Sequence, residues 1–290
     1  MPRELLESEV FRMSNQNRDA EYTMGRTDEE TQRLIEQSQL YDDVTRRFFL
    51  RSGIAKGMKV LDVGSGAGDV ALTLSEFVGP EGQVVGVDVN PDILETAQAR
   101  ADAGGYSNIE FIAGDTRTLE LQSDFDAVAG RLVLMYMADP GDALRHLATH
   151  LKPGGILAFQ EVDFTPYTAA THPDTPLANT LIDWGRTVFE RSGAHLEMGM
   201  DLYKAFVDAG LPEPTLHFEA PMGGPENWAG YEYLANSFRS LVPLMEAYGI
   251  ATADEVDVDT LAARIQTEVA AAKRPIMLPP HITAHASLAS

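Results

Sequence analysis

Between residues 59 and 161, short apolar runs alternate with longer helical patterns along the chain. The apolar runs have the length and composition of strands, and they lie at Lys59–Val63, Gln83–Val87, Ile109–Ala113, Phe125–Ala129 and Ile156–Glu161. The helical patterns lie at Asp69–Val78, Asp92–Ala103 and Gly141–Leu151. Nearly continuous apolar strands separated by helices indicate a parallel sheet that is covered on both faces. The sequence therefore predicts an α/β fold with a Rossmann-like, doubly wound sheet.

The segments on either side of this unit are predicted to be mainly helical. Residues 1–56 form an N-terminal segment in which Thr27–Glu30 has the pattern of a capping box at the start of a helix. Further helices are predicted over Pro176–Ser192, Asp201–Ala209, 226–248 and 259–273, and further strands over Thr215–Ala220 and Ile276–Ala286, the last one broken by Pro279 and Pro280.

The helical stretch between the last two predicted strands is too long for a simple connection. We interpret it as a helical cap inserted before the last strand, within a single domain of residues 57–290. The helical insertions of that domain are expected at about 166–198 and 225–273.

Charge and residue usage exclude several classes of protein. The chain has 22 Lys+Arg against 44 Asp+Glu and a formal net charge of −22, which argues against nucleic acid as a partner. It contains no cysteine, so disulfides, thiolate nucleophiles and cysteine-based metal sites are absent. No apolar run approaches the roughly 18–20 residues of a membrane span, and the N-terminus lacks the pattern of a signal peptide. We therefore expect a cytoplasmic protein, for which a homodimer is compatible with the sequence.

A glycine-rich turn follows the first predicted strand. The segment Val60–Asp69 runs from a strand through the pattern G-x-G-x-G into a helix, an arrangement that lets the backbone approach a ligand closely. A dinucleotide fingerprint would require glycine at position 69, where this chain has Asp69. The acidic residue therefore disfavours a nicotinamide-dependent oxidoreductase.

Four more short elements follow the next strands in order. Gly86-Val87-Asp88 ends the second strand, and a carboxylate there can accept both hydroxyls of a ribose. Gly114-Asp115 follows the third strand, Gly130-Arg131 follows the fourth, and Leu151–Gly155 forms the turn into the fifth.

In order and spacing, these five elements resemble the class I S-adenosylmethionine-dependent methyltransferases. Within that superfamily, the chain is most similar to small-molecule methyltransferases of the ubiquinone/menaquinone-biosynthesis type. The resemblance covers residues of about 57–165 strongly and the flanks only in general layout. It implies a seven-stranded, mostly parallel sheet, S-adenosyl-L-methionine as the cofactor and a small-molecule substrate.

The resemblance also implies roles for individual residues. Asp62, Gly64, Ser65 and Gly66 would line the methionine part of the cofactor, Asp88 would bind the ribose, and Val89 and Asn90 would lie beside the adenine. Gly114, Asp115 and Thr116 would bind the adenine edge. Arg131 would provide a backbone contact, or its side chain would pair with the cofactor carboxylate or a neighbouring acid. Tyr22 and Gln37 would belong to the N-terminal segment that closes over the cofactor.

Substrate contacts are expected at the carboxyl ends of the fourth and fifth strands and in the cap. The candidate substrate-binding residues are Met135, Tyr136, Trp184, Asn236 and Arg239, and the cap is expected to supply Trp228, Tyr231 and Tyr233 as well. The candidate catalytic residues are Glu161 and Tyr136. Each has a structural alternative: core packing for Met135 and Tyr136, a buried hydrogen-bond partner for Glu161, cap packing for the aromatic residues and a helix surface for Arg239. Three histidines lie in the segments expected near the substrate, namely His195, His281 and His285, and each is either structural or catalytic. No metal is expected, because no set of ligands with suitable spacing lies near the predicted site.

The expected reaction is methyl transfer to a small, partly apolar metabolite, of the kind found in secondary metabolism. We expect O-methylation first, with C- or N-methylation open because no residue identifies the nucleophile. The alternative is a non-methylating enzyme of the pericyclase type, or a sensor, that binds the same cofactor on the same fold.

Overall fold

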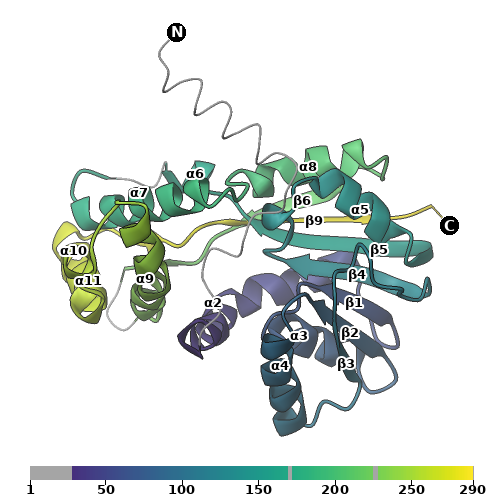
Figure 1. Cartoon of the computed structure of the whole chain (residues 1–290). Coiled ribbons are helices and arrows are strands. Elements are labelled where there is room, and N and C mark those ends of the chain that lie inside the picture. The colour runs from purple at the N-terminus through teal and green to yellow at the C-terminus, as the bar shows by residue number, and fades with distance from the viewer. Residues whose placement is uncertain (1–27, 169–171, 225–227, 290) are drawn as a thin grey trace.

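The computed structural model describes residues 28–168, 172–224 and 228–289. Its centre is a seven-stranded sheet with the strand order β3-β2-β1-β4-β5-β9-β6 (Figure 1). The strands are β1 (Lys59–Val63), β2 (Gln83–Asp88), β3 (Ile109–Ala113), β4 (Phe125–Arg131), β5 (Leu151–Val162), β6 (Thr215–Glu219) and β9 (His281–Ser287). Only β9 runs antiparallel to its neighbours β5 and β6 in this sheet. The prediction of a Rossmann-like, mostly parallel sheet is confirmed.

Helices cover both faces of the sheet because successive strand residues point to opposite sides. On one face, Val60 and Val84 pack with α2 (Asp28–Ser52) and α3 (Asp69–Val78). On the other face, Leu61 and Val85 pack with α5 (Pro140–Ala148) and α8 (Met198–Asp208). The helix α4 (Pro91–Gly104) begins where Asn90 accepts a hydrogen bond from the Asp92 amide at 3.1 Å. Shorter elements are η1 (Leu134–Tyr136) and α6 (Thr165–Thr168).

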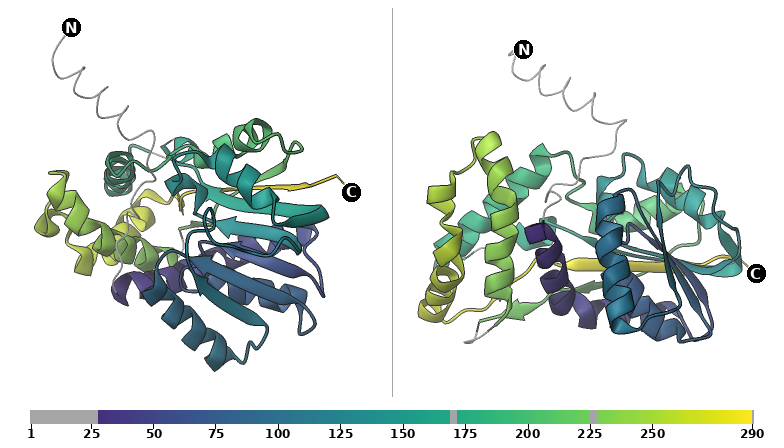
Figure 2. Two further views of the ribbon diagram at one scale, coloured as in Figure 1. Left: turned by 45° about the vertical axis from the view of Figure 1, so that its right-hand side comes forward. Right: turned by 60° about the horizontal axis from the view of Figure 1, so that its bottom comes forward.

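The predicted cap lies beside the sheet and is inserted between β6 and β9 (Figures 1 and 2). It comprises α9 (Gly230–Ala247), α10 (Ala253–Val256) and α11 (Val258–Ala272), with a two-stranded ribbon of β7 (Met222–Gly223) and β8 (Ile276–Met277). Its apolar core also receives α7 (Pro176–Arg191) and Tyr41 of α2. Among the described helices, none has both the length and the apolar character needed to cross a membrane.

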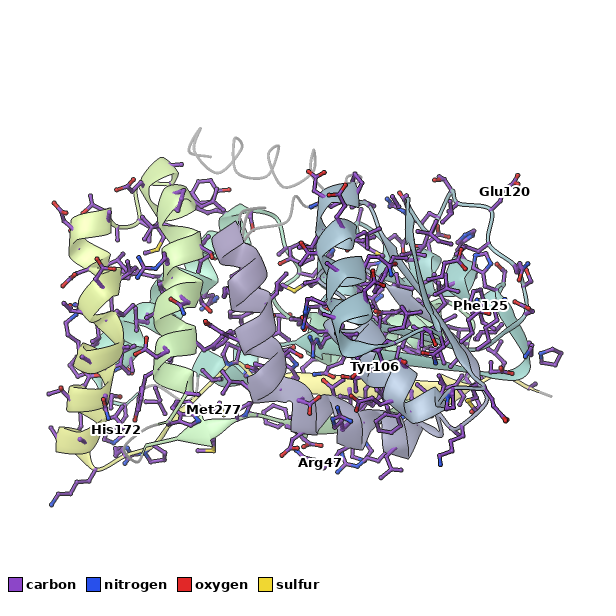
Figure 3. The ribbon with its side chains drawn as sticks, turned by 90° about the horizontal axis from the view of Figure 1, so that it is seen from below. Arg47, Tyr106, Glu120, Phe125, His172 and Met277 are labelled. Atoms are coloured by element: carbon purple, nitrogen blue, oxygen red, sulfur yellow. The ribbon has the colours of Figure 1, made fainter. Side chains whose placement is uncertain are left out.

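The long helix α2 lies between the cap and α4 when the molecule is seen from below (Figure 3). Arg47 and Arg51 fasten it to the sheet edge, because both guanidinium groups bond the Glu219 carboxylate of β6, at 2.6 Å and 2.5 Å. The same helix therefore reaches both the sheet and the cap.

Several boundaries differ from the sequence predictions. The segment 276–286 is two strands in two different sheets, because Pro279 and Pro280 have no amide hydrogen with which to continue a ladder. Helix α5 ends at Ala148, so Leu151 already belongs to β5. Helix α8 begins three residues earlier than predicted, at Met198. The predicted capping box at Thr27 lies outside the described residues.

Candidate active site

A cavity of about 490 Å³ lies at the carboxyl ends of β1, β2 and β4, under α2, α7 and α9. Its volume is within the range of small-molecule sites. One half is polar and is formed by the glycine-rich turn and the loops after β2 and β3. The other half is largely apolar, and its wall includes Leu34, Tyr41, Val162, Phe164, Leu181, Ile182, Phe189, Tyr233, Leu234, Phe238 and Leu241.

The glycine-rich turn places bare backbone on the polar half of the wall. Gly64 and Ser65 donate their amides to the carbonyl of Val87, at 2.8 and 3.0 Å, which ties the turn to β2. Gly66 has a φ of 52°, which side chains rarely adopt, and a Cβ there would meet no atom within 4 Å. Because Gly66 faces open space on the cavity wall, a ligand can approach its backbone closely.

Asp88 is held in place by backbone amides at the end of β2. One carboxylate oxygen accepts from Gly66 and the other from Asn90, both at 2.9 Å. Each oxygen retains a lone pair, so the group can still accept two hydroxyls of a ribose. Val89 follows on the wall with 61% of its surface exposed, and it offers an apolar face next to the carboxylate.

Asp69 lines the cavity but does not stand as an isolated negative charge at the start of α3. Its carboxylate is buried and pairs with Arg100 at 2.7 Å, and Arg100 also bonds the carbonyl of Ala67 at 2.5 Å. The pair fixes the end of the turn to α4.

Replacing Arg100 with alanine should lower the free energy of unfolding by about 1–3 kcal/mol, because the buried Asp69 carboxylate would lose its partner. Urea unfolding followed by circular dichroism measures this change. Lys204→Ala removes an exposed ion pair with Asp208 and is the matched control, which should leave stability nearly unchanged. Equal effects of the two substitutions would contradict the role of Arg100.

The loop after β3 contributes Gly114, Asp115 and Thr116 to the wall. The Asp115 carboxylate bonds the Arg117 side chain at 2.6 Å and the Arg117 amide at 2.9 Å. Arg117 holds the pKa of Asp115 below its usual value, so this carboxylate is an anion in a fixed position. The arrangement is compatible with the expected contact to an adenine edge.

Asp62 lies behind the wall rather than on it. The residue is 1% exposed, and neither carboxylate oxygen has a hydrogen-bond partner among the described residues. Burial raises its pKa well above the usual value, although the charge of Arg131 acts in the opposite direction. A buried, unpartnered carboxyl beneath a glycine-rich turn fits a cationic group such as the ammonium of a methionine moiety.

Arg131 and Gln37, for which cofactor contacts are predicted, both line the cavity. The Arg131 guanidinium donates to Thr45 Oγ1 of α2 at 3.3 Å. Tyr22 lies outside the described residues.

Glu161 does not line the cavity, and its side chain has no exposed surface. One carboxylate oxygen accepts from the backbone amides of Val133 and Leu134, at 3.0 and 2.9 Å. Burial raises its pKa to about 7. These contacts support the structural alternative, in which Glu161 holds the segment that follows β4, and they give no support to Glu161 as a base in contact with substrate.

The segment held by Glu161 brings Met135 and Tyr136, two of the predicted substrate contacts, onto the cavity wall. It leaves β4 through Leu132, whose φ of 56° is unusual for a leucine. The Leu132 amide donates to the carbonyl of Gln160 at 2.9 Å. Tyr136 is the predicted catalytic residue that the structure does place at the cavity.

Most of the other predicted substrate contacts do not line the cavity, and the structure corrects their placement. Asn236 donates to Glu36 at 2.8 Å, Arg239 pairs with Asp259 at 2.8 Å on an exposed helix face, and Trp184 packs against the cap core. Helix α9 places Tyr233, one of the expected cap residues, on the cavity wall, and with it the unpredicted Leu234, Phe238 and Leu241. The spacing of Leu234, Phe238 and Leu241, four and three residues along α9, is the signal that could have identified these three. Tyr41 also lines the cavity without having been predicted to do so, and His281, whose role the sequence leaves open, lies on the same wall.

Residues 54–210 match the model of the methyltransferase domain family, which is just over half of the chain. The chain belongs to this family. The ubiquinone/menaquinone biosynthesis C-methyltransferase UbiE of Pseudomonas putida (strain W619) is 33% identical over 185 residues, covering 59% of this chain and 72% of the relative. The UbiE protein of Pseudomonas fluorescens (strain SBW25) is 39% identical over the same length and with the same coverage.

Solved structures share the fold of this methyltransferase at low sequence identity. YcgJ from Bacillus subtilis aligns with a TM-score of 0.53 and 16% identity, over 86% of this chain and 99% of that one. Phosphoethanolamine N-methyltransferase 2 from Haemonchus contortus, in complex with phosphomonomethylethanolamine and S-adenosylhomocysteine, aligns with a TM-score of 0.54 and 16% identity. That alignment covers 86% of this chain and 53% of the other.

The protein is an S-adenosylmethionine-dependent methyltransferase, and its polar half-cavity fits the cofactor. The open face at Gly66, the oriented Asp88 carboxylate and the unpartnered Asp62 carboxyl are features that the adenosine and methionine parts of that molecule would use. Within the described part of the chain, no three His, Asp or Glu side chains gather as a metal site would require.

Proposed function

We propose that this methyltransferase transfers a methyl group to a carbon atom of a small, largely apolar molecule that carries an oxygen beside the accepting carbon. The apolar half of the cavity carries the proposal. Its described wall combines aliphatic and aromatic side chains with neutral polar groups and the cationic Arg131, and the acids on the wall all belong to the polar half. A substrate with an ammonium group would find no carboxylate partner on the described part of this apolar wall.

The accepting atom is inferred from the relatives and from chemistry. The UbiE proteins are named as C-methyltransferases. An oxygen on an aromatic ring or an enol makes the neighbouring carbon electron-rich, so such a carbon can attack a methyl group without a strong base. O-methylation is the second candidate, because the tyrosine, histidine and arginine groups on the wall can hold an oxygen as well as orient a carbon.

The residues of the site act by positioning and by excluding water. When bound, S-adenosylmethionine supplies a methyl group that is activated by its positively charged sulfur. The walls from α7 and α9 bury the substrate and hold the nucleophile at the roughly 3–3.5 Å that in-line transfer requires. Tyr136 lies after the carboxyl end of β4 on the cavity wall, where its hydroxyl can donate a hydrogen bond to the substrate oxygen.

The N-terminal segment, residues 1–56, would close the site over the cofactor, as expected from the sequence. Arg33, Gln37 and Tyr41 of α2 all line the cavity, and α2 packs against α9 of the cap. Residues 57–290 then form the catalytic domain, with the cap as its substrate wall.

The product identifies the reaction. The purified enzyme is incubated with S-adenosylmethionine that carries a carbon-13-labelled methyl group. One set of incubations adds a metabolite extract, and a second set adds a panel of phenols and naphthols. Products are detected by mass and the labelled carbon is located by NMR, since methyl groups on carbon, oxygen and nitrogen resonate in separate ranges. A methyl group on carbon supports the proposal, a methyl group on oxygen favours the second candidate, and no labelled product contradicts both.

With a substrate in hand, Phe238→Ala should raise KM about 10-fold or more, because a buried aromatic contact on the apolar wall is lost. Calorimetry should show unchanged binding of S-adenosylhomocysteine. Val242→Ala, on the same helix but outside the wall, is the control. A KM that is unaffected by Phe238→Ala would place the substrate elsewhere.

A further inference from the structure

A row of polar side chains crosses the sheet on the face that α2 covers. Arg131 of β4 pairs in register with Gln160 of β5, and Gln160 pairs with Thr283 of β9. His281 lies two residues before Thr283 and therefore points to the same face. Thr45 of α2 lies over the row and bonds both Arg131 and Gln160. Buried polar groups of this kind are retained in a core when they are hydrogen-bonded.

The hydrogen bonds in this row have one consistent direction. A guanidinium can only donate, so Thr45 Oγ1 accepts from Arg131 at 3.3 Å. The Thr45 hydroxyl donates to Gln160 Oε1 at 3.0 Å, which leaves the Gln160 amide nitrogen to face His281 Nδ1 at 2.7 Å. An amide nitrogen donates, so Nδ1 of His281 is an acceptor and the proton of the neutral ring is on Nε2.

The surroundings keep this ring neutral and fixed. Burial and the charge of Arg131 lower the pKa of His281 to about 3. The ring stacks on Tyr41 with centroids 3.9 Å apart and planes 10° apart, and the Tyr41 hydroxyl donates to the carbonyl of Pro279 at 2.9 Å. The imidazole is therefore a donor with a fixed orientation rather than a base.

His281 lies on the wall of the apolar half-cavity. Its register partner Val162 and its stacking partner Tyr41 also line the cavity, and Tyr41 meets Tyr233 of the cap edge to face. In the described chain, the hydrogen bond observed for this ring joins Nδ1 to Gln160, and Nε2 is the ring nitrogen that remains. An N–H donor in an apolar wall destabilises the protein unless a ligand accepts a hydrogen bond from it.

We propose that the Nε2–H group of His281 binds an oxygen atom of the substrate and so selects an oxygen-bearing acceptor over its hydrocarbon analogue. The inference rests on the proposed function of the cavity as a substrate site. It adds the residue that recognises the oxygen, and it assigns Arg131, Thr45 and Gln160 as positioning residues that set the tautomer of that ring.

The first measurement is the protonation state of His281, read by NMR of the full chain with nitrogen-15-labelled histidine. His281→Gln removes the signal and so assigns it. We expect a neutral ring with the proton on Nε2 throughout the range of about pH 6–8. A ring protonated on Nδ1, or an imidazolium, would overturn the proposal.

The second measurement uses acetophenone and ethylbenzene, which have similar shapes and differ in the carbonyl oxygen. Acetophenone should shift the Nε2–H signal of His281, and ethylbenzene should not. The preference for acetophenone over ethylbenzene should fall about 3- to 10-fold in His281→Phe, as expected for one hydrogen bond, and should be partly kept in His281→Gln, which retains an N–H donor.

Thr283→Val is the matched control, because it changes the next residue on the same face of β9 without removing a bonded group. It should leave the preference unchanged. An unmoved Nε2–H signal, or the same preference in the wild type and His281→Phe, overturns the proposal. Neither measurement requires methyl transfer, so its failure is distinct from a failure to find a methylated product.

Discussion

Replacing Asp88 with alanine should weaken the binding of S-adenosylhomocysteine about 100-fold. The carboxylate is oriented by the amides of Gly66 and Asn90, and each oxygen retains a lone pair for a ribose hydroxyl. Hydrogen bonds to a charged acceptor are worth about 1.5–3 kcal/mol each, and part of the loss of two is offset when water fills the space. Titration calorimetry with the purified protein measures the change directly.

Asp102→Ala is the matched control for this prediction. Asp102 is an exposed acid on α4 that bonds Gln98, so its removal changes the net charge equally without touching the cavity. The affinity of Asp88→Asn for S-adenosylhomocysteine should fall between those of Asp88→Ala and Asp102→Ala, because an amide keeps one acceptor oxygen. Thermal unfolding checks that the variants remain folded. Binding that is unchanged in Asp88→Ala would place the ribose elsewhere and contradict the cofactor half of the site.

The cofactor half was predictable because its residues follow one another at the ends of consecutive strands. A glycine-rich turn, an acid after β2 and an acid after β3 meet at one edge whenever the sheet is parallel, and Gly66, Asp88 and Asp115 do line one cavity. Helix α3 also has the predicted bounds, since glycines mark both of its ends. Local signals and sheet topology are enough for this half.

The substrate half depends on packing between segments that are far apart in the sequence. Tyr41, Leu181 and Leu234 come from α2, α7 and α9 and share one apolar cluster. Which face of α9 meets the cavity is decided by that docking, and it turned Phe238 inward and Arg239 outward. The family model stops at residue 210, before α9 begins, so it does not cover the part of the wall that α9 supplies. The cap is therefore where we expect the specificity of this methyltransferase to be encoded.

From the sequence, Glu161 could be either a base in contact with the substrate or a buried hydrogen-bond partner, and the structure supports the second role. An acid at the end of β5 is where a base for the substrate would stand. The structure instead turns the carboxyl toward the backbone amides of Val133 and Leu134. Val133 also packs so close to Gly64 that a side chain at position 64 would clash with it. Glu161 thus supports the segment that carries Met135 and Tyr136, and its burial has a consequence for stability.

Glu161→Gln should remove a pH-dependent loss of stability. Burial raises the pKa of Glu161 from 4.5 to about 7, so the folded protein retains this proton over a range where the unfolded chain has released it. Because the folded state binds more protons between these two values, wild-type stability falls as the pH rises from about 4.5 to about 7 and then levels off. The full contribution is about 3 kcal/mol, at 1.36 kcal/mol for each pKa unit.

Glutamine mimics the protonated carboxyl, since its oxygen can still accept from both amides and its nitrogen replaces the oxygen that has no partner in the described structure. The stability advantage of Glu161→Gln over wild type should therefore widen by about 2 kcal/mol between about pH 5.5 and pH 8. Urea unfolding at several pH values measures it, and comparing the two proteins cancels the other titrating groups, Asp62 included. The same substitution at the exposed Glu213 is the control for replacing a glutamate by glutamine. Parallel stability curves for wild type and Glu161→Gln would mean that the Glu161 carboxyl is ionised in the folded protein at neutral pH.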